Sequence, residues 1–240
     1  SNALYRHLLQ HAMPQQAGRD DLGIPESGNG VPDVADEAKW ELDWLEGMQD
    51  ADGGAFCIVK PNNTWYQGGM PNDPGNDNDG LDRMLLPKDT SCTLRLAAAM
   101  ATAASSAVMK KHFPADAARY LNRAQRAFAW SEANPNPLCY HFYGCNHTVA
   151  GDSCDPGGHG PCDAVLSSRV WAALAMWLAT GNETLHEYVI ANHQPGYRQW
   201  GWGLYPDAWG TINLQYLFSA AKHPSRTTNP ALLQKVKNEV

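Results

Sequence analysis

Seven cysteine and histidine residues lie within a short stretch of this sequence, and both residue types can bind zinc. They are Cys139, His141, Cys145, His147, Cys154, His159 and Cys162. None of their spacings is the tight two-cysteine knuckle of structural zinc sites. The chain has 6 cysteines in all, and an even number favours disulfides formed in an oxidising compartment. We therefore expect an extracellular protein with a disulfide-linked loop and no zinc; the 15 possible connectivities stay open.

A second polar stretch, NDPGNDNDGLD, has the composition of a calcium-binding loop. If Gly80 were the central glycine of such a loop, Gly75 would occupy the first ligand position and Leu86 the last. Those two positions normally carry Asp and Glu. A solvated acidic loop fits this stretch better, so we expect no metal and no cofactor here.

Aromatic residues gather in the segments that lack helical periodicity. Exposed aromatic rings along a cleft suit sugars, whose C–H groups pack on the negative face of a ring. Packing in the core or at a loop anchor is the alternative for any one of them. The residues in question are Trp65, Tyr66, Tyr140, Tyr143, Trp200, Trp202 and Tyr205.

Composition excludes several classes of protein. The net charge is −7, from 25 acidic and 18 basic residues, which disfavours a nucleic-acid partner. No stretch approaches the roughly 20 apolar residues of a membrane span, and no nucleophile elbow, phosphate loop or dinucleotide fingerprint is present. Residues 1–3 resemble a tag-cleavage remnant. Residues 4–240 are expected to form a single domain with a hydrophobic core.

The elements that must position these residues are helices. Apolar residues at helical spacing predict helices over 4–12, 33–49, 89–113, 115–133, 164–181, 182–193 and 207–221, and one from Pro230 onward. Asp33 is the expected N-cap of its helix. Trp40 and Trp44 are expected to stack four residues apart beside a wide apolar face. About eight helices and no alternating strand signal predict an all-α fold of helical hairpins packed side by side.

Long irregular segments follow alternate helices, at 13–32, 51–88, 134–162 and 195–206. If the hairpins stand side by side, these segments should collect at one end of the assembly. Binding residues concentrate in loops on a rigid scaffold. That end is therefore the expected site.

Four segments of the sequence carry a resemblance to a known family. They are IPESGNGVPDVADEAKWELDWLEGMQDADGG, LLPKDTSCTLRLAAAMATAA, SSRVWAALAMWLATGNETL and WGWGLYPDAWGT. Together, and in this order, they resemble the family 9 glycoside hydrolases. The resemblance covers about residues 20–221. It implies an (α/α)6-barrel, or toroid, which is expected to be incomplete here. It also implies an inverting hydrolase of β-1,4-glucans such as cellulose.

The resemblance implies no catalytic residue in this chain. The family's base lies in an Asp-Ala-Gly-Asp motif ahead of the first matched segment, and its acid is a Glu near the end of the module. An inverting mechanism needs both carboxylates. Asp20, Asp21, Glu26 and Glu37 match non-catalytic family positions, and loop or capping roles explain them. We therefore expect this chain alone to be inactive, with a non-catalytic carbohydrate-binding remnant as the alternative.

The resemblance also implies which residues contact the glucan. Trp65, Tyr66, Trp200 and Trp202 match or neighbour the family's sugar-contacting aromatic residues. Some members hold calcium with an Asp-Glu pair at the start of one helix. Ser167 and Ser168 stand there instead and leave only Asp207 as a match, so calcium is doubtful. An incomplete barrel would expose apolar faces, so self-association is expected.

Overall fold

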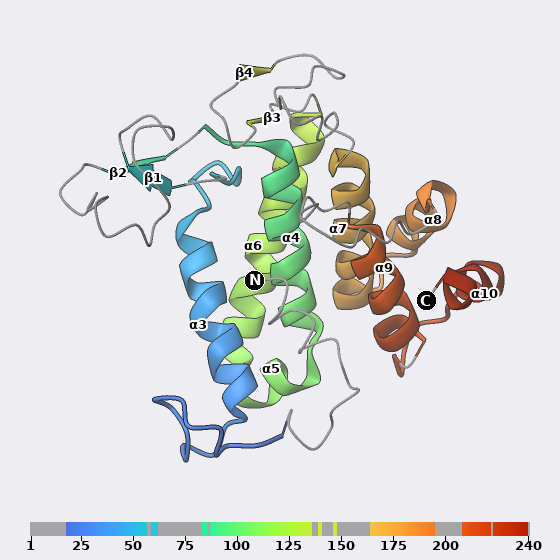
Figure 1. Ribbon diagram of the computed structural model, residues 1–240. Helices are drawn as coiled ribbons and strands as arrows, with labels where there is room; N and C mark the ends of the chain where they lie inside the picture. Colours follow the sequence, from blue (N-terminus) through green and yellow to red (C-terminus); the bar gives the residue numbers. More distant parts are fainter. Residues whose placement is uncertain are drawn as a thin grey trace.

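The computed structural model describes residues 18–56, 59–61, 83–85, 87–135, 139–140, 146–147, 164–194, 208–221 and 223–239. Figure 1 shows helices standing side by side, with the short strands gathered at one end. Helix α4 (Thr90–Ser105) lies between α6 (Pro114–Ala133) and α7 (Ala164–Thr180) and packs closely on both. Its Ala97, Ala98 and Ala101 are fully buried. Such small side chains let two neighbouring helices approach one helix closely.

Helix α3 (Asp33–Gly47) docks on α6 mainly through charged side chains. Glu46 accepts from Arg119 at 2.8 Å and from Arg123 at 2.7 Å. Its two tryptophans lie outside the buried face of the helix, since Trp40 is 71% exposed and Trp44 is 56% exposed. Both lie on the side of α3 that turns away from α4 and α6, because Ala38 and Leu42 form its buried stripe.

The start of α3 also differs from the prediction. Pro32 takes the N-cap position and makes no side-chain capping bond, so Asp33 is the first helical residue. The buried Asp33 carboxylate accepts instead from the Leu22 amide at 2.5 Å and from Ser27 Oγ at 2.7 Å. Asp33 therefore ties the preceding loop to the helix.

The helix predicted over 89–113 is two helices, α4 and α5 (Ala107–His112). Ser106 has an extended backbone (ψ 127°) and ends α4. Its hydroxyl accepts from the Met109 amide at 3.4 Å and thereby caps α5. A serine competes for backbone donors in this way, which favours a break where hydrophobic periodicity alone predicts continuity.

The C-terminal half continues the hairpin pattern. Helix α7 turns at Gly181, which has φ +77°, into α8 (Glu183–Asn192). Helix α9 (Trp209–Gln215) runs into a π-helical turn, η1 (Tyr216–Ala220), and α10 (Pro230–Glu239) follows. Asn182 caps α8 by accepting from the Thr184 amide at 3.1 Å. The described residues thus contain eight α-helices, as many as expected, although the predicted helix at 4–12 lies outside them.

Two short antiparallel pairs of strands were not predicted. Strand β1 (Val59–Pro61) pairs with β2 (Arg83–Leu85), and Lys60 lies opposite Met84. Strand β3 (Cys139–Tyr140) pairs with β4 (Asn146–His147). Segments of two or three residues are too short for an alternating hydrophobic pattern to be visible in the sequence.

The prediction that all the long segments collect at one end was wrong for residues 18–32 (Figure 1). Helix α3 ends where α4 begins, since Lys88 Nζ lies 2.7 Å from Asp50 Oδ2. Helix α3 therefore begins at the opposite end, together with residues 18–32 (Figure 1). There the Asp20 carboxylate accepts from the amides of Gly28 at 2.6 Å and Gly30 at 2.7 Å. Asp20 thus orders its own loop.

A buried histidine makes the fold sensitive to acid. His186 stacks on Trp177 with ring centres 3.8 Å apart, and its Nε2 lies 2.9 Å from the Tyr216 hydroxyl. Burial lowers the pKa of His186, although nearby Glu183 opposes that shift. The unfolded chain, with an ordinary histidine pKa of about 6.5, therefore binds the proton more readily than the folded chain does.

Because the unfolded state binds more protons, the free energy of unfolding should fall as pH drops below about 6.5. Urea unfolding at pH 7, 6.5, 6, 5.5 and 5 measures this slope. Replacing His186→Phe keeps an aromatic ring on Trp177 and should flatten the slope. His193, whose pKa burial also lowers, should keep part of it. Equal slopes for the variant and the original chain would contradict the assignment to His186.

Candidate functional site

One end of the helical assembly collects four helix termini and the segments between them. At this end Thr90 Oγ1 at the start of α4 donates to the Asn134 carbonyl at the end of α6, at 3.0 Å. The Ala208 amide just before α9 donates to Ser167 Oγ near the start of α7, also at 3.0 Å. The segments 62–82 and 195–207 leave and rejoin the described fold near this end, which is the expected place for a site.

The four predicted sugar-contacting residues, Trp65, Tyr66, Trp200 and Trp202, lie outside the described residues. The seven cysteines and histidines considered as zinc ligands lie in the segment 139–162, and their side chains are likewise outside them. Cys92, on α4, is disulfide-bonded, as expected for a chain made in an oxidising compartment. Within the part of the chain that the structure describes, no group of three or more His, Cys, Asp or Glu residues could hold a metal ion.

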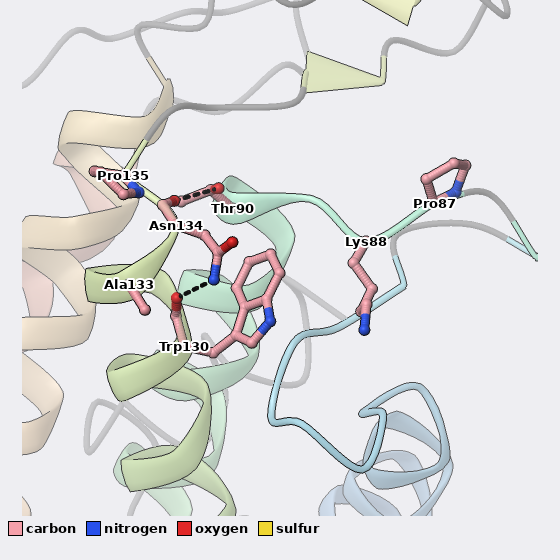
Figure 2. A pocket seen from close by; sticks show the side chains of 7 residues that line it. All are labelled: Pro87, Lys88, Thr90, Trp130, Ala133, Asn134 and Pro135. Atoms are coloured by element: carbon pink, nitrogen blue, oxygen red, sulfur yellow. Dashed lines mark hydrogen bonds between the residues drawn. The ribbon is translucent and has the colours of Figure 1, made fainter.

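A pocket of about 370 Å³ opens at this end between the start of α4 and the end of α6. Figure 2 shows Trp130 at its base, with Asn134 on one side and Lys88 on the other. Its lining is formed by Pro87, Lys88, Thr90, Trp130, Ala133, Asn134 and Pro135. No feature of the sequence marks this pocket, because Trp130 is only one position of a predicted helix.

A hydrogen-bonded cluster holds the tryptophan of this pocket in place. Trp130 Nε1 donates to Asp52 Oδ2 at 3.0 Å. Lys88 Nζ lies 2.7 Å from Oδ2 of both Asp50 and Asp52. The hydrogen bond from Lys88 is the largest cause that lowers the pKa of each carboxyl, and the two carboxylates raise the pKa of Lys88. At neutral pH the cluster therefore carries two negative charges and one positive charge.

A glycine lets the loop approach this tryptophan closely. A Cβ on Gly54 would lie 2.5 Å from Trp130 Cε2 and 2.9 Å from Lys88 Cδ. Any larger residue would displace one of the two side chains. The pair Gly53-Gly54, far from Trp130 in the sequence, is the signal that could have pointed to a close approach of backbone.

The position where the resemblance implies calcium does not fit a cation. Ser168 Oγ lies 3.1 Å from Ser91 Oγ and accepts from Arg95 Nε at 3.2 Å. Ser167 Oγ accepts from the Ala208 amide. The Arg95 guanidinium beside Ser168 places positive charge where calcium needs carboxylates.

Comparison with known proteins shows the family of this chain. The sequence model of "Glycosyl hydrolase family 9" matches residues 8–239. The chain belongs to glycosyl hydrolase family 9. The resemblance inferred from four segments is therefore confirmed.

Curated family 9 relatives are glucan-degrading enzymes by name. A xyloglucan-specific endo-beta-1,4-glucanase of Bacteroides ovatus is 30% identical over 192 residues, which are 77% of this chain and 30% of that protein. A cellulose 1,4-beta-cellobiosidase of Acetivibrio thermocellus is 32% identical over 197 residues, 79% of this chain and 20% of that enzyme. This family 9 chain thus spans less than a third of the length of either relative.

Solved structures of family 9 enzymes share its fold. The structure of a Bacteroides ovatus family 9 enzyme has a TM-score of 0.72 and 25% identity, and covers 98% of this chain and 41% of its own. A metagenome-derived family 9 endoglucanase has a TM-score of 0.70 at 24% identity and likewise covers 98% of this chain and 39% of its own. The predicted fold class, helical hairpins of the (α/α)6-barrel type, is confirmed by these neighbours.

Proposed function

We propose that this family 9 chain is the central, sugar-binding part of an inverting β-1,4-glucan hydrolase, whose base and acid lie in segments beyond these 240 residues. The family match over residues 8–239 carries the proposal. The names of the relatives supply the substrate class. A solved family 9 neighbour with a TM-score of 0.67 is described in complex with a cellobiose-like isofagomine, which supports a glucan as ligand.

The geometry of the described residues supports the proposal that the carboxylates in the loop before α3 are not catalytic. Asp20, Asp21 and Glu26 belong to the loop at the start of α3, at the end opposite the Trp130 pocket (Figure 1). Asp20 is engaged by two glycine amides, and Asp21 by Arg19 Nε at 2.6 Å. The carboxylates of Asp20 and Asp21 thus hold a loop together. The sugar contacts are assigned in this proposal to Trp65, Tyr66, Trp200 and Trp202, on segments that leave from the pocket end.

The test is release of reducing sugar from soluble carboxymethyl cellulose, with and without added calcium, beside binding of cellotetraose followed by tryptophan fluorescence. We expect no turnover in either condition, and saturable binding that Trp202→Ala weakens roughly tenfold. Trp177→Phe, which removes a fully buried tryptophan of α7, controls for a general change in fluorescence. Turnover by the chain alone would contradict the proposal that the catalytic base and acid lie outside these 240 residues.

A non-catalytic binding remnant remains the second candidate, because one observation favours it. Ser168 accepts from the Arg95 guanidinium and Ser167 from the Ala208 amide, where a calcium site would have its carboxylate pair. An active relative has reason to keep a metal that orders its cleft. The gene on either side of this sequence distinguishes the two, through the presence of the Asp-Ala-Gly-Asp motif and the terminal Glu.

Two further features support proposals about the setting of the protein. The disulfide at Cys92 supports secretion into an oxidising compartment. The exposed Trp40 and Trp44 form an apolar area on α3 that supports self-association.

No helix in the described part of the chain is both long and apolar enough to cross a bilayer. The net charge of −7 disfavours a nucleic-acid partner.

A further inference from the structure

We infer that the Trp130 pocket binds a sugar unit of a neutral glucan, as a contact additional to the four aromatic residues predicted from the sequence. The inference rests on the proposed function, because it takes the glucan as the ligand. The pocket lies between the start of α4 and the end of α6. Neither the resemblance nor the sequence pattern marks this place as a binding site.

The indole ring of Trp130 is held ready for a ligand. Its Nε1–H is already used by Asp52, and Gly54 approaches its Cε2 and Nε1 atoms. The ring therefore loses little conformational freedom when a ligand stacks on it, and such preorganisation favours binding. An aromatic face offers a negative quadrupole to the C–H groups of a pyranose ring.

Polar groups flank the ring and can bond to the hydroxyls of a sugar. Asn134 Nδ2 donates to the Trp130 carbonyl at 2.8 Å, and its Oδ1 points into the space toward Lys88 (Figure 2). That oxygen is an acceptor for a hydroxyl. Lys88, on the other side, uses two of its three N–H donors on Asp50 and Asp52. An acceptor on one side of the Trp130 ring and a donor on the other suit a polyhydroxylated ligand.

The charge of the cluster determines which sugars fit. Asp50 and Asp52 do not line the pocket but both pair with its one charged lining residue, Lys88, so the cluster as a whole carries a net charge of −1 at neutral pH. A uronic acid or a phosphate would have to compete with these two carboxylates for Lys88. The volume of about 370 Å³ lies at the lower end for small-ligand pockets. A neutral saccharide is therefore the class that this pocket accepts.

The experiment is isothermal titration of the whole chain with cellotetraose. Trp130→Ala should raise the Kd roughly tenfold. Trp40→Ala, which removes an exposed tryptophan of α3, is the matched control and should leave the Kd unchanged. Trp130→Phe, which keeps an aromatic face, should recover most of the affinity. Tri-galacturonate should not compete with cellotetraose.

A loss of affinity in Trp130→Ala could reflect unfolding, so two further measurements accompany it. The thermal midpoint shows whether the variant is folded, and Asn134→Ala, at an exposed position, should weaken binding without lowering that midpoint. Cellotetraose binding that Trp202→Ala weakens and both pocket variants leave intact would overturn this inference and keep the proposed function. No binding of cellotetraose by the original chain would overturn both.

Discussion

Replacing Trp177 with alanine should lower the free energy of unfolding by about 3–5 kcal/mol. Trp177 is fully buried in α7. It stacks on His186 and Tyr216, with ring centres 3.8 and 6.5 Å away, and its Nε1 donates to Glu183 Oε1 at 2.9 Å. The substitution removes an aromatic volume that joins α7, α8 and η1. It also leaves a cavity that these helices cannot fill without losing their hydrogen bonds.

The matched control is Trp40→Ala, the same change at a position that is 71% exposed. Its effect should stay within about 0.5 kcal/mol, as for most surface substitutions. Urea unfolding followed by circular dichroism measures both, and Trp177→Ala should lower the thermal midpoint by roughly 10 °C for a chain of this size. Similar losses from the two variants would show that the Trp177 cluster is not a centre of the core.

Replacing Gly53 with alanine should have the second-largest effect, because two independent penalties act at this residue. Its backbone has φ +104°, a conformation that costs other residues about 1–3 kcal/mol. In addition, a Cβ would lie 2.7 Å from the carbonyl oxygen of Arg126 on α6. That atom belongs to helix backbone, so it cannot move aside. The loop 50–54 would have to leave α6, and the Lys88–Asp52–Trp130 cluster would loosen.

Two other glycines separate these penalties. Gly28 has φ +91° but nothing within 4 Å of its Cβ position, so Gly28→Ala tests the backbone strain alone. Gly47, in the last turn of α3, has neither problem, and Gly47→Ala should stabilise the chain by about 0.5–1 kcal/mol. The expected order of stability is Gly47→Ala, the original chain, Gly28→Ala and then Gly53→Ala. Equal losses at Gly28 and Gly53 would contradict the close approach to α6.

The sequence by itself was sufficient for most of the described helices and for the family. Periodicity, the Asp89 cap that accepts from the Cys92 amide at 2.8 Å, and the turn at Gly181 are local signals, so they are legible within a few residues. The order of four matching segments indicated a family 9 glycoside hydrolase, and the family model then matched residues 8–239. Asn182 also stands at the helix start that the local pattern predicts.

Only the tertiary structure decided which faces and ends of those helices come together. The periodicity of α3 marks one buried stripe, but the exposure of Trp40 and Trp44 depends on which helices pack against it. The end at which residues 18–32 lie follows from the direction of α3 relative to α4. The Trp130 pocket depends on Asp52 and Trp130, which are 78 residues apart and meet at 3.0 Å. Local preferences carry no information about such pairs, because the two residues are far apart in the sequence and meet only through the packing of the helices and loops between them.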